Sequence, residues 1–168
     1  RQVVRKMYPH YEDGYYEYPV DRLLKLQDFI TEDAMHNPDM LDRDNKPCLF
    51  VTKNGSATGV TIGSATGVFS YVREYCGDGT KQTSVEWSIL PYDRKSGDFS
   101  AAGDSGSVIV DRRGRIGGLL TGGTGDPHTG DTSDTESTDI TYATPFAWLF
   151  QRIKANGFPD AHLHPVIA

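Results

Sequence analysis

The feature that most constrains this chain is a serine framed by glycines in its second half. Residues 103–107 are Gly-Asp-Ser-Gly-Ser and lead directly into the apolar residues 108–110. A second glycine-rich stretch, Thr-Gly-Gly-Thr-Gly at 121–125, begins sixteen residues after Ser105 and ends another apolar run. Glycine permits the tight turn that such a segment needs. The pattern predicts a turn that presents the Ser105 hydroxyl, followed by two strands.

Short strands are expected through most of the chain from residue 48 onward. Runs rich in β-branched and aromatic residues are separated by Gly, Asn or Asp, and they cover 48–52, 58–62, 66–72, 84–90, 107–110, 116–121 and 140–144. Six or seven short strands in about a hundred residues are typical of one small closed barrel. We therefore predict a mainly β domain over 48–168, built as an antiparallel six- or seven-stranded barrel.

Helices are expected only outside these strands. Pro145 opens a run with apolar residues at helical spacing through residue 155, which predicts a C-terminal helix. In the first 47 residues, Asp21 is a suitable cap for a short helix that reaches Ile30. The rest of 1–47 is rich in tyrosine, acidic residues and turn formers. We expect it to be an irregular N-terminal arm or connector.

A repeated hexapeptide lies between the first strands. Gly-Ser-Ala-Thr-Gly-Val occurs at 55–60 and again at 63–68. Two copies are too few for a solenoid. We expect two adjacent strands of one hairpin or corner, with glycines where backbones approach closely.

The composition excludes several classes of protein. The chain has 168 residues, which suits one domain with a substantial core. Its net charge of −6, without a cluster of Lys and Arg, argues against a nucleic acid as partner. No apolar run approaches about 18 residues and no secretory leader is recognisable, so no membrane partner is expected. The sequence does not indicate a compartment.

No metal or cofactor is predicted. Cys48 and Cys76 match no metal-ligand spacing and are either two reduced thiols, which we favour, or one disulfide. The carboxylates of the loop at 126–139 offer oxygen ligands for calcium, but their spacing matches no calcium-binding loop. We favour a solvated loop.

Four elements in chain order resemble the C-terminal half of the trypsin-like (chymotrypsin-fold) serine proteases. They are the glycine-rich strand at 53–63, the Gly-Asp-Ser-Gly turn, the Thr-Gly-Gly strand, and Tyr-Ala-Thr-Pro at 142–145 before a helix. The resemblance implies the second barrel of that fold and hydrolysis of peptide bonds through an acyl-enzyme. The alternative Gly-x-Ser-x-Gly elbow of α/β-hydrolases is not matched, because its last position is Ser107.

The resemblance also implies a role for each residue of the serine turn. Ser105 would be the catalytic nucleophile, and the backbone amides of Gly103 and Ser105 would form the oxyanion hole. Asp104 would be buried as structural support and paired with a cation. An arginine and a processed N-terminal amine remain equal candidates for that cation.

A substrate pocket follows from the same resemblance. Phe99 would line its floor, and Thr121, Gly122 and Gly123 would form the wall that pairs with the substrate backbone. Phe99 offers no carboxylate to a Lys or Arg substrate, and Leu120 stands where acid-specific members have His. We therefore expect a small or apolar residue before the scissile bond.

A general base for Ser105 is not identifiable. Without one the hydroxyl is a poor nucleophile at neutral pH. His36 lies upstream, but Met35 stands where the family has Ala, and too few residues follow before Cys48 to complete a first barrel. We interpret His36 as a helix-end or surface residue and His128 as part of a solvated loop.

Two explanations of the missing base remain. The one we favour is that the chain is the C-terminal part of a longer or two-chain serine endopeptidase acting on polypeptide substrates. The first barrel would then lie on a separate chain or in a removed segment. The alternative is a catalytically inactive pseudoprotease that acts as a peptide- or protein-binding module, because strand pairing with a peptide needs no triad.

Overall fold

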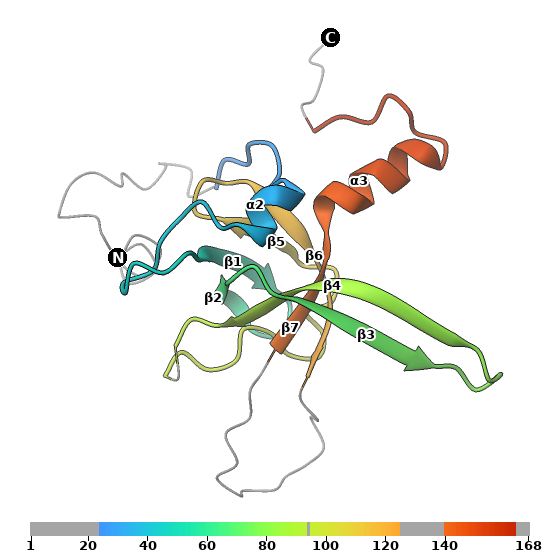
Figure 1. The fold of residues 1–168 in the computed structure, drawn as a ribbon, viewed down its shortest axis with the longest axis horizontal. Helices are drawn as coiled ribbons and strands as arrows, with labels where there is room; N and C mark the ends of the chain where they lie inside the picture. Colours follow the sequence, from blue (N-terminus) through green and yellow to red (C-terminus); the bar gives the residue numbers. More distant parts are fainter. Residues whose placement is uncertain (1–23, 94, 125–139, 164–168) are drawn as a thin grey trace, which may run out of the picture.

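The computed structural model describes residues 24–93, 95–124 and 140–163 (Figure 1). Seven strands and two helices occupy this part of the chain. In chain order they are α2 (Glu32–His36), β1 (Leu49–Gly55), β2 (Gly59–Ala65), β3 (Phe69–Tyr75), β4 (Lys81–Pro91), β5 (Val108–Asp111), β6 (Ile116–Thr124), β7 (Ile140–Pro145) and α3 (Phe146–Ala155). Each predicted strand is present, with shifted ends, and so is the C-terminal helix.

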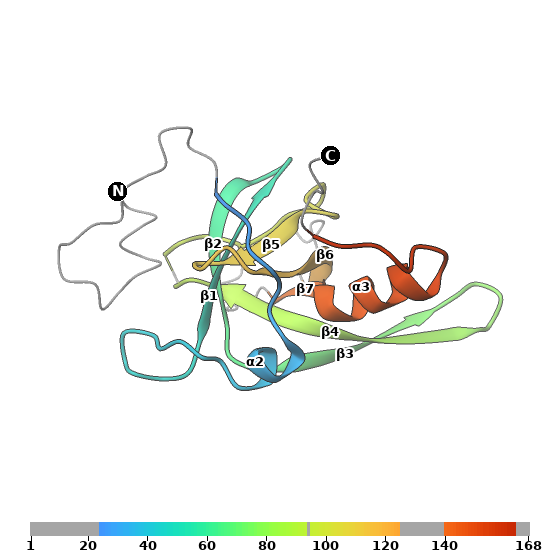
Figure 2. The same ribbon diagram turned by 90° about the horizontal axis from the view of Figure 1, so that it is seen from above.

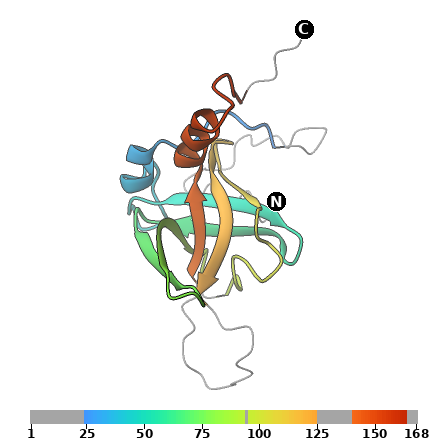
Figure 3. The same ribbon diagram turned by 90° about the vertical axis from the view of Figure 1, so that its right-hand side faces the viewer.

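Six of the strands close into an antiparallel barrel. The sheet order is β2-β1-β5-β6-β7-β4-β3, and β2 also pairs with β4 through Gly63 to Pro91 and Ser64 to Leu90. This last pairing closes the ring and leaves β3 outside it, attached to β4 alone (Figure 3). The prediction of a mainly β antiparallel barrel with a C-terminal helix is therefore confirmed.

The long hairpin of β3 and β4 projects from the barrel. β3 pairs with β4 from Phe69 opposite Trp87 to Tyr75 opposite Lys81, whereas the backbone pairing of β7 with β4 is limited to Trp87, Ser88 and Ile89. The N-terminal half of β4 thus extends beyond the barrel on the same side as α3, and the two elements diverge from each other away from the barrel (Figures 1 and 2). This arrangement leaves one edge of β4 without a neighbouring strand in the described chain.

The barrel interior is filled by inward-facing side chains around Trp87. Leu49, Val51, Ile89 and Ile109 are fully buried there. A Cβ atom at Gly117 would lie 2.5 Å from the Trp87 ring, so glycine at this position makes room for the indole. The core thus depends on small residues in β6 as well as on large ones in β4.

The arm before the barrel is packed more closely than expected, and its helix is in another place. The segment from Leu24 to Ile30 is not helical, because Ile30 donates its amide to the Ile116 carbonyl at 2.9 Å and Phe29 forms a parallel bridge with Ile116. The predicted helix over 21–30 is therefore wrong in its described part. A five-residue helix follows instead, with Thr31 as its cap.

The two repeat copies have different structural roles. The first forms the tight turn between β1 and β2, where Gly55 lies opposite Gly59. The second ends β2 and turns toward β3. A Cβ at Gly63 would lie 2.8 Å from both the Leu90 carbonyl and the Phe99 ring, so a close approach does occur at this glycine.

Cys48 and Cys76 are both free in the structure, which corresponds to the reduced alternative. Burial raises the pKa of the Cys48 thiol to about 11. Within the described chain, no helix is long and apolar enough to cross a membrane. The acidic loop, with His128, lies outside the described residues, as does His10.

Candidate active site

The Ser105 turn connects β4 to β5 and is fixed to β6. Gly103 and Gly106 have φ angles of +103° and +82°, which glycine adopts without steric cost. The Gly106 amide donates to the Leu120 carbonyl at 2.8 Å, and the Leu120 amide donates to the Ser107 carbonyl at 3.0 Å. These bonds hold the exposed Ser105 beside the point where β6 continues as Thr121.

Asp104 is fully buried, and its carboxylate has a complete set of partners. Oδ1 accepts from the amides of Ala57 at 2.7 Å and Thr58 at 3.2 Å. Oδ2 accepts from the Thr58 hydroxyl at 2.7 Å and the Ala101 amide at 3.1 Å, and it lies 2.9 Å from the Lys53 ammonium. Burial alone would raise the pKa of Asp104, but these donors outweigh it and hold the pKa well below the ordinary value.

The cation beside Asp104 is Lys53, so the expectation of an arginine or a processed N-terminal amine in this position is wrong. Both side chains are completely buried. Lys53 also donates to the Gly59 carbonyl at 3.2 Å and to the Thr58 hydroxyl. Leu49, Val51 and Lys53 alternate along β1 and all point inward, so period-two patterning was the signal that identifies this lysine as a core residue.

Gly55 allows the buried carboxylate to approach β1. A Cβ atom at this position would lie 2.2 Å from Oδ1 of Asp104, closer than any side chain can accept. Its φ angle is not in the left-handed region, so space alone requires glycine here. The first repeat copy therefore helps to build the support of the serine turn.

The two amides predicted to form an oxyanion hole are unoccupied. Within the part of the chain that the structure describes, neither the Gly103 amide nor the Ser105 amide has a hydrogen-bond acceptor. Free amides beside a serine are what such a hole requires. The role of these two groups stays a prediction.

Among the described residues, the Ser105 hydroxyl is not hydrogen-bonded to a base. No described side chain is hydrogen-bonded to it. His36 stacks on Phe69 with ring centroids 4.4 Å apart, so its imidazole is engaged at β3. The interpretation of His36 as a helix-end residue agrees with its position as the last residue of α2.

Phe99 lies in the barrel core and has no exposed surface. Its ring stands 5.7 Å from the Lys53 ammonium, and its carbonyl accepts from the Thr61 hydroxyl at 2.6 Å. Phe99 thus contacts the Lys53 ammonium that pairs with Asp104. Its predicted role as a pocket floor remains untested.

The segment from Thr121 to Gly123 has one open backbone edge. β7 pairs with Gly122 and Gly123 through Tyr142 and Thr141, and a bulge lies at Thr121. On the other side the pairing with β5 ends at Leu119 opposite Val108. No described strand continues along that side past Leu120, so the predicted wall has free backbone groups next to the Ser105 turn.

Comparisons with known proteins add little to this geometry. No family model matches the sequence, and neither does any curated protein. Among solved structures, the chain is similar to a chymotrypsin of Cellulomonas bogoriensis, with 20% identity and a TM-score of 0.40. The match covers 62% of this chain and 46% of that one, so it spans about half of the protease. At this TM-score the likeness supports no inference, and the barrel assignment rests on the strand pairings above.

Proposed function

We propose that this chain carries the nucleophile of a serine endopeptidase, with Ser105 attacking the scissile carbonyl. The observation that carries the proposal is the buried Asp104 carboxylate. Its five contacts fix the backbone on one side of Ser105, while Gly103 and Gly106 shape the turn. Such rigid support is what a preorganised catalytic serine needs.

The proposed reaction uses the Ser105 hydroxyl, a base, and the backbone amides of Gly103 and Ser105. The Ser105 oxygen would form a bond to the carbonyl carbon as its proton passes to a base, and the carbonyl oxygen would become an oxyanion held by the amides of Gly103 and Ser105. As this intermediate collapses, the base would return its proton to the leaving amine, the peptide bond would break, and an acyl-enzyme would remain for water to hydrolyse. The open edge at 121–123 would hold the substrate backbone as an added strand.

We propose further that a first barrel, on a separate chain or in a segment preceding this one, supplies the base and its orienting carboxylate. The position of His36 supports this proposal, because its ring stacks on Phe69 and is not hydrogen-bonded to Ser105. Intact-mass analysis of an active native preparation tests it. We expect a second chain or a larger species, and activity from the 168-residue chain alone would contradict it.

The second candidate function is a peptide-binding module without turnover, which the open edge at 121–123 favours. Titration with extended peptides separates the two functions when the wild-type chain and Ser105→Ala are compared in the native assembly. If the chain belongs to a protease, the wild type should cleave the peptide at least about 10⁴ times faster than Ser105→Ala. Equal binding without cleavage in both would favour the module.

A further inference from the structure

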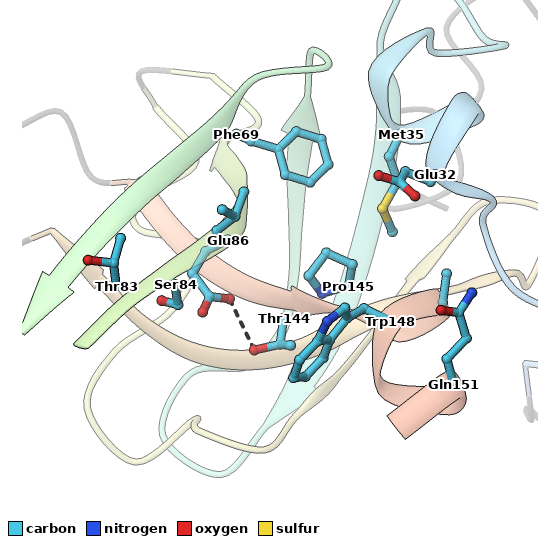
Figure 4. Close-up of a pocket in the computed structure, with 12 residues that line it drawn as sticks. Glu32, Met35, Phe69, Thr83, Ser84, Glu86, Thr144, Pro145, Trp148 and Gln151 are labelled. Carbon is cyan, nitrogen blue, oxygen red and sulfur yellow. Dashed lines mark hydrogen bonds between the residues drawn. The ribbon is translucent and has the colours of Figure 1, made fainter. Parts of the chain in front are cut away.

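A pocket of about 560 Å³ lies on the outside of the barrel, between the β3–β4 hairpin, α2 and α3 (Figure 4). Four consecutive residues of β4, from Thr83 to Glu86, line it. Successive side chains of a strand point to opposite faces, so a space that touches four in a row lies along the edge of the strand. This is the edge that β7 leaves unpaired beyond Trp87.

One wall of this edge pocket carries a buried carboxylate that no Lys, Arg or His of the described chain pairs with. Glu86 is only 7% exposed, and its Oε2 accepts one hydrogen bond, from the Thr144 hydroxyl at 3.0 Å. No ion pair to Glu86 is formed within the described residues. Among the described residues, Oε1 of Glu86 is not one of the buried atoms that lack a partner, so this oxygen is accessible and can accept from an incoming cation.

The remaining lining suits a long cationic side chain rather than a small ion. Phe69 and Trp148 contribute apolar surface, and Glu32 adds a second carboxylate. None of the described lining residues is Lys, Arg or His. Arg152 stands over the Trp148 ring at 5.8 Å but makes no ion pair with either glutamate. An apolar stem and a planar charged head are the features of arginine.

We propose that the edge pocket binds an extended, arginine-bearing segment of a partner polypeptide. The partner backbone pairs with the free edge of β4 at Thr83–Glu86, and its guanidinium binds the Glu86 carboxylate beside Trp148. The net charge of −6 also favours a basic partner. This inference does not depend on Ser105 or on the proposed protease activity.

The test is a titration followed by NMR, with a capped pentapeptide that has arginine at its centre and valine and threonine on either side. The chain has two tryptophans, so the Trp148 indole signal is identifiable once Trp148→Leu removes it. We expect this signal to move on titration. We also expect a peptide with neutral citrulline in place of arginine to bind at least tenfold more weakly.

Two variants of the protein locate the charge contact. Glu86→Gln keeps the acceptor for Thr144 but removes the charge, and should weaken arginine-peptide binding about tenfold or more. Glu74→Gln on the exposed part of β3 is the matched control and should leave binding unchanged. Because Glu86 is buried, Glu32→Gln at the exposed rim provides a second variant, expected to weaken binding by a smaller factor.

Strand pairing is tested on the peptide itself. A version with methylated backbone nitrogens should lose most of its affinity, and acetyl-arginine amide alone should bind at least tenfold more weakly than the pentapeptide. The proposal is overturned if the Trp148 signal does not move, if citrulline binds as well as arginine, or if Glu86→Gln binds normally. Equal binding of the single capped arginine would overturn the polypeptide as the occupant.

Discussion

Two of the three buried carboxylates in the described chain, Asp104 and Glu86, differ in how many donors surround them. Asp104, beside the serine turn, has a buried lysine and four hydrogen bonds, whereas Glu86, in the edge pocket, has one hydroxyl donor. The first arrangement is complete within the chain and holds a loop in place. The second is incomplete and suited to a ligand. The number of donors around a buried charge therefore separates a supporting residue from a binding residue.

The largest effect is expected from Lys53→Met, which leaves Asp104 buried without its cation. Removing one partner of a buried pair costs about 3–5 kcal/mol of the free energy of unfolding. Urea denaturation measures this loss. The double variant Lys53→Met with Asp104→Asn should recover part of it, and a single-variant loss under about 1 kcal/mol would contradict the account of Asp104.

Gly55→Ala should be the next most damaging change, because the new methyl group would overlap the Asp104 carboxylate. We expect a loss of roughly 1–3 kcal/mol in the free energy of unfolding, as for other overpacked sites. Gly77→Ala is the matched control, since a Cβ there meets nothing within 4 Å. Similar stabilities of the two variants would show that the serine turn tolerates displacement of Asp104.

The free energy of unfolding should also depend on pH through the Asp104 carboxylate. The folded-state pKa of Asp104 is lowered, so its contribution is fully present above the unfolded value of 3.8 and is lost as the pH falls through the lower folded value. Acid titration of the free energy of unfolding should therefore show a larger decrease below pH 3.8 in the wild type than in Asp104→Asn, in which Asp39 and Asp78 still contribute a decrease. An identical acid limb in both proteins would contradict this assignment.

The smallest effect is expected in the edge pocket. Trp148 is 54% exposed, so Trp148→Gln should change the free energy of unfolding by less than about 0.5 kcal/mol. Trp87→Ala in the barrel core should cost about 3–5 kcal/mol in the same assay. A large loss at Trp148 would mean that α3 supports the fold and is not available to a partner.

The sequence predicts the barrel well because its signals are local. Alternating β-rich runs between turn residues identify every strand, and Pro145 marks the start of α3. In its described part, residues 24–30, the predicted helix is wrong because the same apolar residues take a different arrangement, in which the Ile30 amide bonds to Ile116 of β6. Spacing within a segment cannot reveal that distant partner.

The candidate sites were likewise predictable only in part. The glycine frame of Ser105 is visible in the sequence, and the inward position of Lys53 could have been found from the period of β1. The edge pocket could not, because it depends on where the β4–β7 pairing ends and on how α3 leaves the barrel. Such features arise only when separate elements meet.

Labelling of Ser105 by a fluorophosphonate tests the central claim most directly, because this reagent reports an activated serine and requires a base within hydrogen-bond reach. We predict no labelling of the isolated 168-residue chain and strong labelling, absent in Ser105→Ala, when an N-terminal barrel is restored. Strong labelling of the isolated chain would show that one of its own histidines reaches Ser105, and would contradict a base supplied from outside.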